Sequence, residues 1–234
     1  MVQTRTATGF GTGIYSPRDV ARLIQVRTER VKRWTGGYAF KARDGRSGAS
    51  RPVFESALEE TESLTFLDLV ETLFIKAFLS AGLSLQQIRA AAHEGAKEFG
   101  VRHPFCIKRF VTDGRRVFAN LENTAHDERY VNVLSKQAEF AAVVKPLFKS
   151  LTYSVTADEI VEQWWPRGRE VPIVVDPKVA FGAPVVSGRY VQTAILAAPI
   201  LHGGETIEAV ASWYDVPRAV VEAAVDFERQ LATA

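Results

Sequence analysis

The spacing of hydrophobic residues predicts a short helix close to the N-terminus. Residues 16–19, Ser-Pro-Arg-Asp, form a strong helix start, because serine caps a helix, proline fits its first turn and aspartate faces the positive end of the helix dipole. The apolar positions that follow at helical spacing are Val20, Leu23 and Ile24.

A second short helix is predicted from about Arg27 to the glycine pair at 36–37, with Val31 and Trp34 turned inward. Two short helices joined by a tight turn, the second rich in cations, are typical of a helix-turn-helix. In residues 38–54, aromatic and aliphatic positions flank Asp-Gly at 44–45, a favoured hairpin turn. We interpret this segment as a two-stranded wing.

The middle of the chain predicts two longer helices. Thr65 and Asp68 resemble a capping box before a helix that ends at Gly82, and Ser84 begins the next helix. The large apolar surface of residues 64–81 is either a dimer seam or the face of a core helix.

Further along, Asp-Gly at 113–114 predicts a central β-hairpin whose strands are residues 106–111 and 115–121. Residues 135–151 predict a helix interrupted by proline. A further helix is expected from Thr156 through the tryptophan pair at 164–165.

The last third begins with two strand-like segments, residues 173–177 and 184–191. Three helical stretches follow, and their ranges are 192–201, 206–213 and 217–231. A short turn joins the last two, so they predict a second helix-turn-helix. The fold class we expect is mainly α, with two helix-turn-helix units and short β-hairpins, the wing and the central hairpin.

Composition narrows the class of protein. The 234 residues are 47% hydrophobic and 24% charged, as in folded globular proteins. A single cysteine, Cys106, excludes an internal disulfide. No apolar run approaches the roughly 20 residues that span a bilayer, and residues 1–13 lack a signal-peptide core. We therefore expect a cytoplasmic protein.

Charge is distributed unevenly along the chain. Residues 1–51 hold 11 Lys and Arg against 3 Asp and Glu, a net charge of +8. Residues 52–151 hold 12 against 13, a net of −1, and residues 152–234 hold 6 against 11, a net of −5. The basic N-terminal part should attract a polyanion, and the acidic C-terminal part should not.

The cations around the second short helix are candidate DNA contacts. With Val31 and Trp34 in the core, the neighbouring polar side chains can face outward and reach phosphates or guanine edges. The candidates are Arg27, Thr28, Arg30, Lys32 and Arg33, with Lys41, Arg43 and Arg46 in the wing. The alternative is a helix-turn-helix that is only structural or binds only protein.

Residues 14–60 resemble the MerR-type winged helix-turn-helix. Ala21, Val26 and the run Val-Lys-Arg-Trp at 31–34 occupy matching positions, and Lys32 stands where the family usually has arginine. The resemblance implies DNA binding. The chain departs from the family in lacking the long dimerising coiled coil.

Residues 173–231 resemble a bacterial domain family formerly of unknown function. The matching residues are Asp-Pro at 176–177, the pattern Gly-x-Pro-x-x-x-Gly-Arg at 182–189 and the helix-turn-helix that follows. Members are encoded beside PIN-domain toxins and act as VapB-type antitoxins. The resemblance implies an antitoxin of a type II toxin-antitoxin pair, which neutralises a PIN-domain ribonuclease and binds operator DNA to repress its own operon.

Candidate toxin contacts are Arg167, Arg169 and Arg189. The resemblance implies a nuclease whose carboxylates surround a divalent metal, and a guanidinium can pair with such carboxylates through two parallel hydrogen bonds. The alternative for each arginine is a local salt bridge or a solvated loop charge.

Enzyme signatures are poor, so we predict a non-enzyme with no catalytic residues, metal or cofactor. The histidines at 93, 103, 126 and 202 are scattered. His103 and Cys106 offer two possible zinc ligands and no second pair, where a structural zinc needs four. Gly9-x-Gly11-x-Gly13 has no strand before it and no phosphate-loop lysine.

The predicted domains are a MerR-like unit at 14–60, central helices with a β-hairpin at 61–155 and an antitoxin-associated helix-turn-helix domain at 156–234. Operators are usually read by two-fold dimers, so we expect a homodimer and a hetero-oligomer with the toxin. Two alternatives remain: a MerR-like one-component regulator that senses a small molecule in the middle region, and an adaptor that binds only protein.

Overall fold

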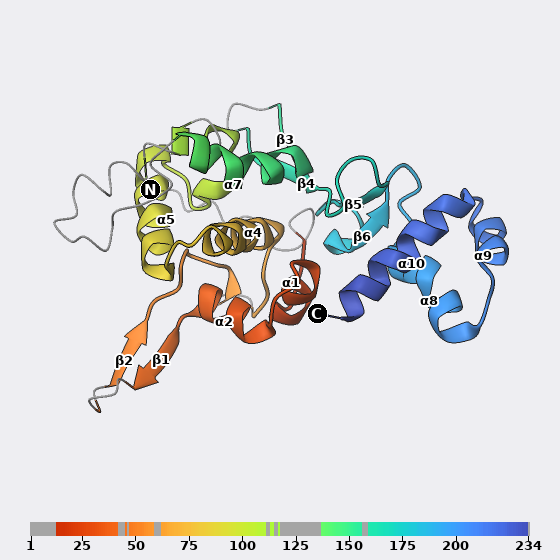
Figure 1. The fold of residues 1–234 in the computed structure, drawn as a ribbon, viewed down its shortest axis with the longest axis horizontal. Helices are drawn as coiled ribbons and strands as arrows, with labels where there is room; N and C mark the ends of the chain where they lie inside the picture. Colours follow the sequence, from red (N-terminus) through yellow and green to blue (C-terminus); the bar gives the residue numbers. More distant parts are fainter. Residues whose placement is uncertain are drawn as a thin grey trace, which may run out of the picture.

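The computed structural model describes residues 13–41, 45, 47–58, 62–110, 113–114, 117, 137–155 and 159–233. It is an elongated molecule with a winged unit near one end and a bundle of three helices at the other (Figure 1). The expected fold class is confirmed, because the structure is mainly helical with short antiparallel hairpins. In the described part of the chain, none of the helices is long and apolar enough to cross a bilayer.

The N-terminal helix-turn-helix forms where the sequence predicts it. Helix α1 (Pro17–Leu23) begins with a capping box, in which the Ser16 hydroxyl accepts from the Asp19 amide and the Asp19 carboxylate accepts from the Ser16 amide. Helix α2 (Thr28–Gly36) follows after a tight turn. Strands β1 (Tyr38–Lys41) and β2 (Ser47–Ser50) pair antiparallel and form the wing.

The central region is built on helix α4 (Phe66–Ser80), which is buried on nearly every side. Helix α5 (Leu85–Phe99), the short 3-10 helix η1 (Pro104–Cys106) and helix α7 (Gln137–Ser150) pack around it. Phe74 and Phe78 of α4 contact the rings of Phe105 and Phe110. Of the two alternatives for residues 64–81, a dimer seam or the face of a core helix, the structure therefore supports the core helix.

The central hairpin was predicted wrongly in its described part. Residues 104–106 form η1, residues 108–110 are helical, and Asp113 and Gly114 are helical where a hairpin turn was expected. The cause is tertiary packing, because Phe105 and Phe110 are fully buried against the α4 rings and a strand would separate them. Residues 111–112, 115–116 and 118–121 of this prediction lie outside the described residues.

The prediction of a helix from Thr156 through residue 165 is also wrong, because residues 161–164 form a strand. Strands β3 (Leu151–Tyr153), β4 (Val161–Trp164), β5 (Ile173–Val175) and β6 (Pro184–Val186) make one antiparallel sheet in that order. Pairing with β3 and β5 fixes residues 161–164 in the extended state, and a local helical pattern does not reveal such partners. The sheet crosses the predicted boundary at 155–156, and the three-part division stays a prediction.

The C-terminal unit consists of helices α8 (Thr193–Gly203), α9 (Ile207–Tyr214) and α10 (Arg218–Ala232). The predicted strand at 173–177 and these three helices are confirmed, each within a few residues. Of the strand predicted at 184–191, only Pro184–Val186 is extended, because the chain turns at residues 187–189. The unit has a small core of its own, made of Val186, Leu196, Ala197, Val210, Val216, Val221, Ala224 and Val225. Asp215 turns the chain between α9 and α10 in the left-handed region, with φ of 49°.

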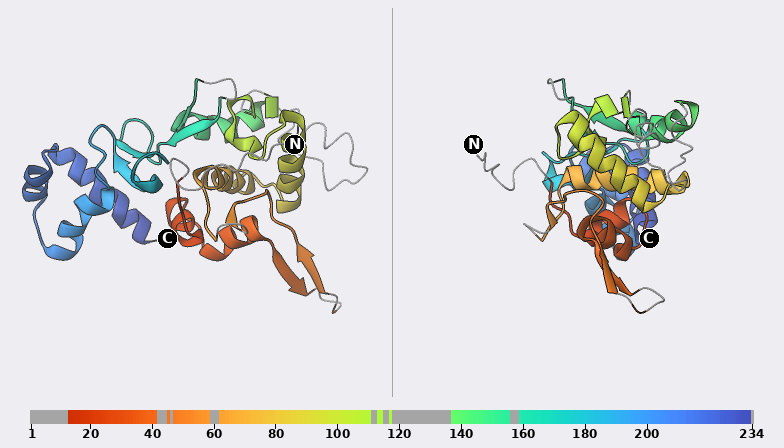
Figure 2. Two further views of the ribbon diagram at one scale, coloured as in Figure 1. Left: turned by 180° about the vertical axis from the view of Figure 1, so that it is seen from behind. Right: turned by 90° about the vertical axis from the view of Figure 1, so that its left-hand side faces the viewer.

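The two helix-turn-helix units meet through α1 and the end of α10, which lie side by side in both views (Figures 1 and 2). Phe227 and Leu231 of α10 enter the main core. The Tyr15 hydroxyl donates to the Gly182 carbonyl at 2.9 Å, and the Gln25 side chain donates to the Gln230 carbonyl at 3.1 Å. The two ends of the chain are thus joined by apolar packing and by hydrogen bonds.

Candidate nucleic-acid interface and adjoining surfaces

Helix α2 has one buried face and one cationic face. Val31 and Trp34 are buried, as the sequence predicts. The side chains of Arg27, Arg30, Lys32 and Arg33 are exposed, and Thr28 is partly exposed. The hydrophobic positions of α2 therefore turn its cations outward together, as a helix that reads DNA requires.

These cations have no acidic partner among the described residues, where no ion pair involves Arg27, Arg30, Lys32, Arg33 or Lys41. The Arg33 guanidinium lies over the Tyr38 ring of β1, 5.2 Å from its centroid. An unpaired surface cation keeps its full attraction for a phosphate, because binding does not require an internal ion pair to break.

The wing extends the same surface. Lys41 ends β1 and is exposed, and the Tyr38 and Phe40 side chains on this strand are exposed as well. The wing candidates Arg43 and Arg46 lie outside the described residues.

Buried hydrogen bonds hold α2 in position. The Val53 amide, just after the wing, donates to the Trp34 carbonyl at 2.8 Å. The Ser56 hydroxyl donates to the Thr35 carbonyl at 2.9 Å, and the Thr35 hydroxyl donates to the Val31 carbonyl at 2.9 Å. The C-terminal end of α2 is thus fixed to the segment that leaves the wing, which preorganises helix and wing as one surface.

The three candidate toxin contacts lie in two places and have different partners. Arg169 donates to the Leu151 carbonyl at 3.0 Å and lies over the Trp165 ring, so it holds its own loop against β3. Arg167 is exposed and forms no ion pair within the described residues. Arg189 pairs with Asp215 at 3.5 Å in the C-terminal unit. Of the three, Arg169 has the clearest structural role.

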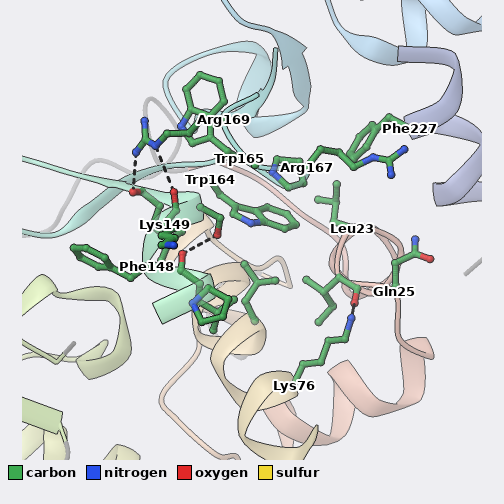
Figure 3. Close-up of a pocket in the computed structure, with 18 of the residues that line it drawn as sticks. Leu23, Gln25, Lys76, Phe148, Lys149, Trp164, Trp165, Arg167, Arg169 and Phe227 are labelled. Carbon is green, nitrogen blue, oxygen red and sulfur yellow. Dashed lines mark hydrogen bonds between the residues drawn. The ribbon is translucent and has the colours of Figure 1, made fainter. Parts of the chain in front are cut away.

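A cavity of about 960 Å³ lies at the junction of the central region with α1 and α10 (Figure 3). Its apolar lining includes Leu23, Trp164, Trp165 and Phe227, and the Arg167 side chain extends toward Phe227. Lys76 lines it as well and donates to the Ile24 carbonyl at 2.7 Å. Burial lowers the pKa of Lys76. Apolar walls with a few polar groups are typical of a ligand site.

Sequence reasoning missed an exposed aromatic surface on the C-terminal unit. Trp213 is 58% exposed and Tyr190 is 62% exposed. The ion pair of Arg189 with Asp215 brings the loop of Tyr190 next to the end of α9, where Trp213 lies. Large exposed aromatic side chains are frequent energetic centres of protein interfaces. The adjacent Trp-Tyr pair at 213–214, at the end of an amphipathic helix, was the available signal.

Comparison with known proteins gives two family matches. Residues 13–92 match the family described as "Putative DNA-binding HTH domain". Residues 173–227 match a family described as a protein of unknown function, DUF433. The first match covers α1, α2, the wing, α4 and the first half of α5, and the second runs from β5 through the C-terminal unit to residue 227 in α10.

A curated relative and a solved structure match nearly the whole chain. The chain is 26% identical over 230 residues to "Putative antitoxin VapB45" of Mycobacterium tuberculosis, covering 93% of this chain and 94% of the relative. The crystal structure of Rv2018 from Mycobacterium tuberculosis aligns with a TM-score of 0.68 at 22% identity, covering 92% of this chain and 99% of that one. The similarity to VapB-type antitoxins with a helix-turn-helix, expected from the sequence, is confirmed.

Proposed function

We propose that this protein is the antitoxin of a type II toxin-antitoxin pair. In this proposal it acts in the cytoplasm, neutralises a PIN-domain ribonuclease and binds operator DNA as a homodimer to regulate its own transcription. The observation that carries the proposal is the division of surfaces in one chain. Among the described residues, the cations of α2 and Lys41 of the wing form no ion pair, whereas the C-terminal unit combines the exposed Trp213 with the ion-paired Arg189 and Arg218.

DNA binding is assigned to the N-terminal unit. Residues 1–51 carry a net charge of +8, and the exposed side chains of α2 include Arg27, Arg30 and Arg33. A match to a DNA-binding helix-turn-helix family over residues 13–92 supports this assignment. Arginine can pair with a guanine edge or hold a phosphate, so this helix can supply both specificity and affinity.

Toxin binding is assigned to the C-terminal half. Similarity to a relative named as an antitoxin, over nearly the full length of both chains, supports an antitoxin role. Residues 152–234 carry a net charge of −5, which disfavours nucleic acid as their partner. Trp213 offers an apolar anchor, and Arg189 offers a guanidinium for the carboxylates of a PIN-type metal site.

The test uses the full chain and the PIN-domain protein that this proposal expects to be encoded beside it. We expect the two proteins to co-purify, the complex to cleave RNA more slowly than the free nuclease, and the antitoxin to retard a DNA fragment upstream of its own reading frame. Light scattering of the free protein should give the mass of a dimer. A PIN-domain protein that neither binds nor is inhibited would reject the antitoxin role, whereas loss of DNA binding alone would reject only autoregulation.

A second candidate function is a one-component transcription regulator that binds a small apolar ligand. The junction cavity favours it, because its lining includes Leu23 near the DNA-binding helices and Phe227 of α10. Quenching of Trp164 and Trp165 fluorescence by a panel of hydrophobic acids would test it, with the Trp164→Phe and Trp165→Phe variants reporting the site. Binding that also changes affinity for the upstream DNA would favour this candidate over the antitoxin role.

A further inference from the structure

A cluster of side chains of the types that bind metals lies in the main core. Glu71 of α4, His103 just before η1 and Cys106 at the end of η1 each offer one ligand atom, and these three atoms lie within 4.8 Å of one another. Glu71 and Cys106 are fully buried. Such side chains in a core are destabilising unless they have partners.

Backbone geometry explains why the side chains converge. His103 caps η1 and Cys106 ends it, and the Cys106 amide donates to the His103 carbonyl at 3.2 Å, so a single turn brings the two residues together. Residues three apart are also neighbours on the surface of an α-helix, so Asp68 and Glu71 share a face of α4. The Phe105 amide donates to Glu71 Oε1 at 3.0 Å, which fixes η1 on that face.

Unpartnered polar atoms collect at this place. Within the described residues, the buried side-chain atoms without a hydrogen-bond partner are Asp68 Oδ1, Glu71 Oε2, His103 Nδ1 and the Tyr153 hydroxyl. Asp68 and Glu71 have no exposed surface. Charge interactions link Asp68 to His103 and Cys106, and Cys106 to Tyr153, so all four atoms belong to one neighbourhood. Native proteins rarely leave several polar groups unpaired together without an occupant.

We propose that Glu71, His103 and Cys106 bind a divalent transition-metal ion of the zinc type. Asp68 Oδ1 is available as a fourth ligand, and Asp68 Oδ2 is already held by the helix cap, where it accepts from the Thr65 amide at 2.8 Å. A mixed sulfur, nitrogen and oxygen set suits zinc and excludes magnesium and calcium, which prefer oxygen alone.

Geometry and charge both accommodate the ion. Zinc bond lengths of about 2.0–2.3 Å imply ligand separations of about 3.3–3.7 Å in a tetrahedron, so side-chain movements of about 1 Å close the site. The Glu71 carboxylate and the Cys106 thiolate balance the two positive charges of the ion, and Asp68 as a fourth ligand would bring the site to a net charge of −1. Without a cation the three groups favour their neutral forms, because burial raises the pKa of Glu71 and of Cys106 and lowers that of His103.

The site lies under the base of the wing, which gives the ion a structural role. The Ala57 amide donates to Asp68 Oδ2 at 3.3 Å, and the Phe54 ring lies 6.1 Å from the His103 ring. The Arg102 side chain donates to the carbonyls of Glu55 and Ser56 at 3.0 Å. Metal binding would therefore tie η1, α4 and the segment that leaves the wing to one point.

The test is a titration of the metal-stripped full chain with Co²⁺ and Zn²⁺. We expect one equivalent of Co²⁺ to produce a thiolate charge-transfer band and tetrahedral visible bands, which Zn²⁺ abolishes. Zn²⁺ at about 100 times its Kd should raise the thermal midpoint by about 5 °C or more. Magnesium should do neither.

Two variants and a control locate the ion. Cys106→Ser should remove the charge-transfer band. Glu71→Gln resembles the neutral carboxyl, so it should keep the metal-free fold, as judged by its melting curve, and bind Co²⁺ at least tenfold more weakly. His93→Gln, an exposed histidine on α5, is the matched control and should behave as the parent. Absence of the thiolate band in the parent protein, or unchanged Co²⁺ affinity in Glu71→Gln, would overturn the proposal and leave a neutral hydrogen-bonded cluster.

Discussion

The two helix-turn-helix units share a backbone plan and differ in what their second helix presents to solvent. The cations at and along α2, among them Arg30 and Arg33, have no acidic partner within the described residues. In the C-terminal unit, Arg218 at the start of α10 pairs with Glu208 at 2.6 Å and with Glu222 at 2.8 Å, which raises its pKa. A helix-turn-helix is therefore a scaffold, and the neighbours of its cations indicate whether phosphates are its target.

The tryptophans of the two units differ in the opposite direction. Trp34 at the end of α2 is buried in the main core, whereas Trp213 at the end of α9 is 58% exposed. The N-terminal unit thus uses Trp34 to hold a cationic helix in place, and its exposed aromatic residues, Tyr38 and Phe40, lie on the wing. The C-terminal unit leaves Trp213 available to a partner, which is the division of work that the proposed function requires.

The largest expected effect is the loss of DNA affinity when cations are removed from the N-terminal unit. The triple variant Arg27→Ala, Arg30→Ala and Arg33→Ala should weaken binding to the upstream DNA by at least about 100-fold, at about 1–3 kcal/mol for each arginine that pairs with a base. For each arginine that instead holds a phosphate, the salt dependence of log affinity should fall by about one unit. Fluorescence anisotropy across a salt series measures both quantities.

The matched control removes the same charge from the other unit. Arg189→Ala, Arg218→Ala and Arg229→Ala together also subtract three cations, all of which are ion-paired in the free protein. We expect less than a threefold decrease in DNA affinity. Equal decreases in the two triple variants would move the DNA site to the C-terminal unit.

The aromatic side chains provide the second test. Trp213→Ala should weaken toxin binding by about 30-fold, because truncation of an interface anchor typically costs at least about 2 kcal/mol. Phe40→Ala removes a comparably exposed aromatic from the wing and should leave toxin binding unchanged. Isothermal titration with the PIN-domain protein measures the toxin affinity of both variants. A larger loss in Phe40→Ala than in Trp213→Ala would place the toxin on the winged unit.

Local signals explain which parts of the fold the sequence predicts. The starts of α1, α4 and α5 are capping boxes within four residues of chain, and all three are where the sequence puts them. Strand β4 depends on partners such as Val175, which the local pattern does not contain. The proposed metal site could not be predicted from the local pattern either, because the Phe105 amide that binds Glu71 lies 34 residues further along the chain. The outward face of α2 follows from helical periodicity, whereas the ion pairs that neutralise Arg218 are tertiary.

Arg189 tests how the toxin would be silenced. Arg189→Ala should raise residual ribonuclease activity of the complex by about tenfold, which is less than a deeply buried pair would give, since Arg189 is already paired with Asp215 in the free protein. Arg189→Lys should recover part of the inhibition, because an ammonium lacks the planar fork of the guanidinium. The measurement is RNA cleavage by purified complexes at matched concentration. Full inhibition by the alanine variant would show that the role of Arg189 is limited to its ion pair with Asp215.

The smallest expected effect concerns the bond that joins the two units. Tyr15 is 3% exposed and its hydroxyl donates to the Gly182 carbonyl, while the ring packs in the main core. Tyr15→Phe keeps the ring and removes the donor, so the carbonyl loses its partner at a cost of about 1 kcal/mol. In a chain of this size we expect the thermal midpoint to fall by about 2–4 °C. Tyr190→Phe, at an exposed position, should leave the midpoint unchanged.

DNA affinity of the Tyr15→Phe variant should equal that of the parent, because none of the α2 cations depends on this bond. If DNA affinity falls with the melting temperature, the two units are energetically coupled through Tyr15, and the separation of their roles is incomplete.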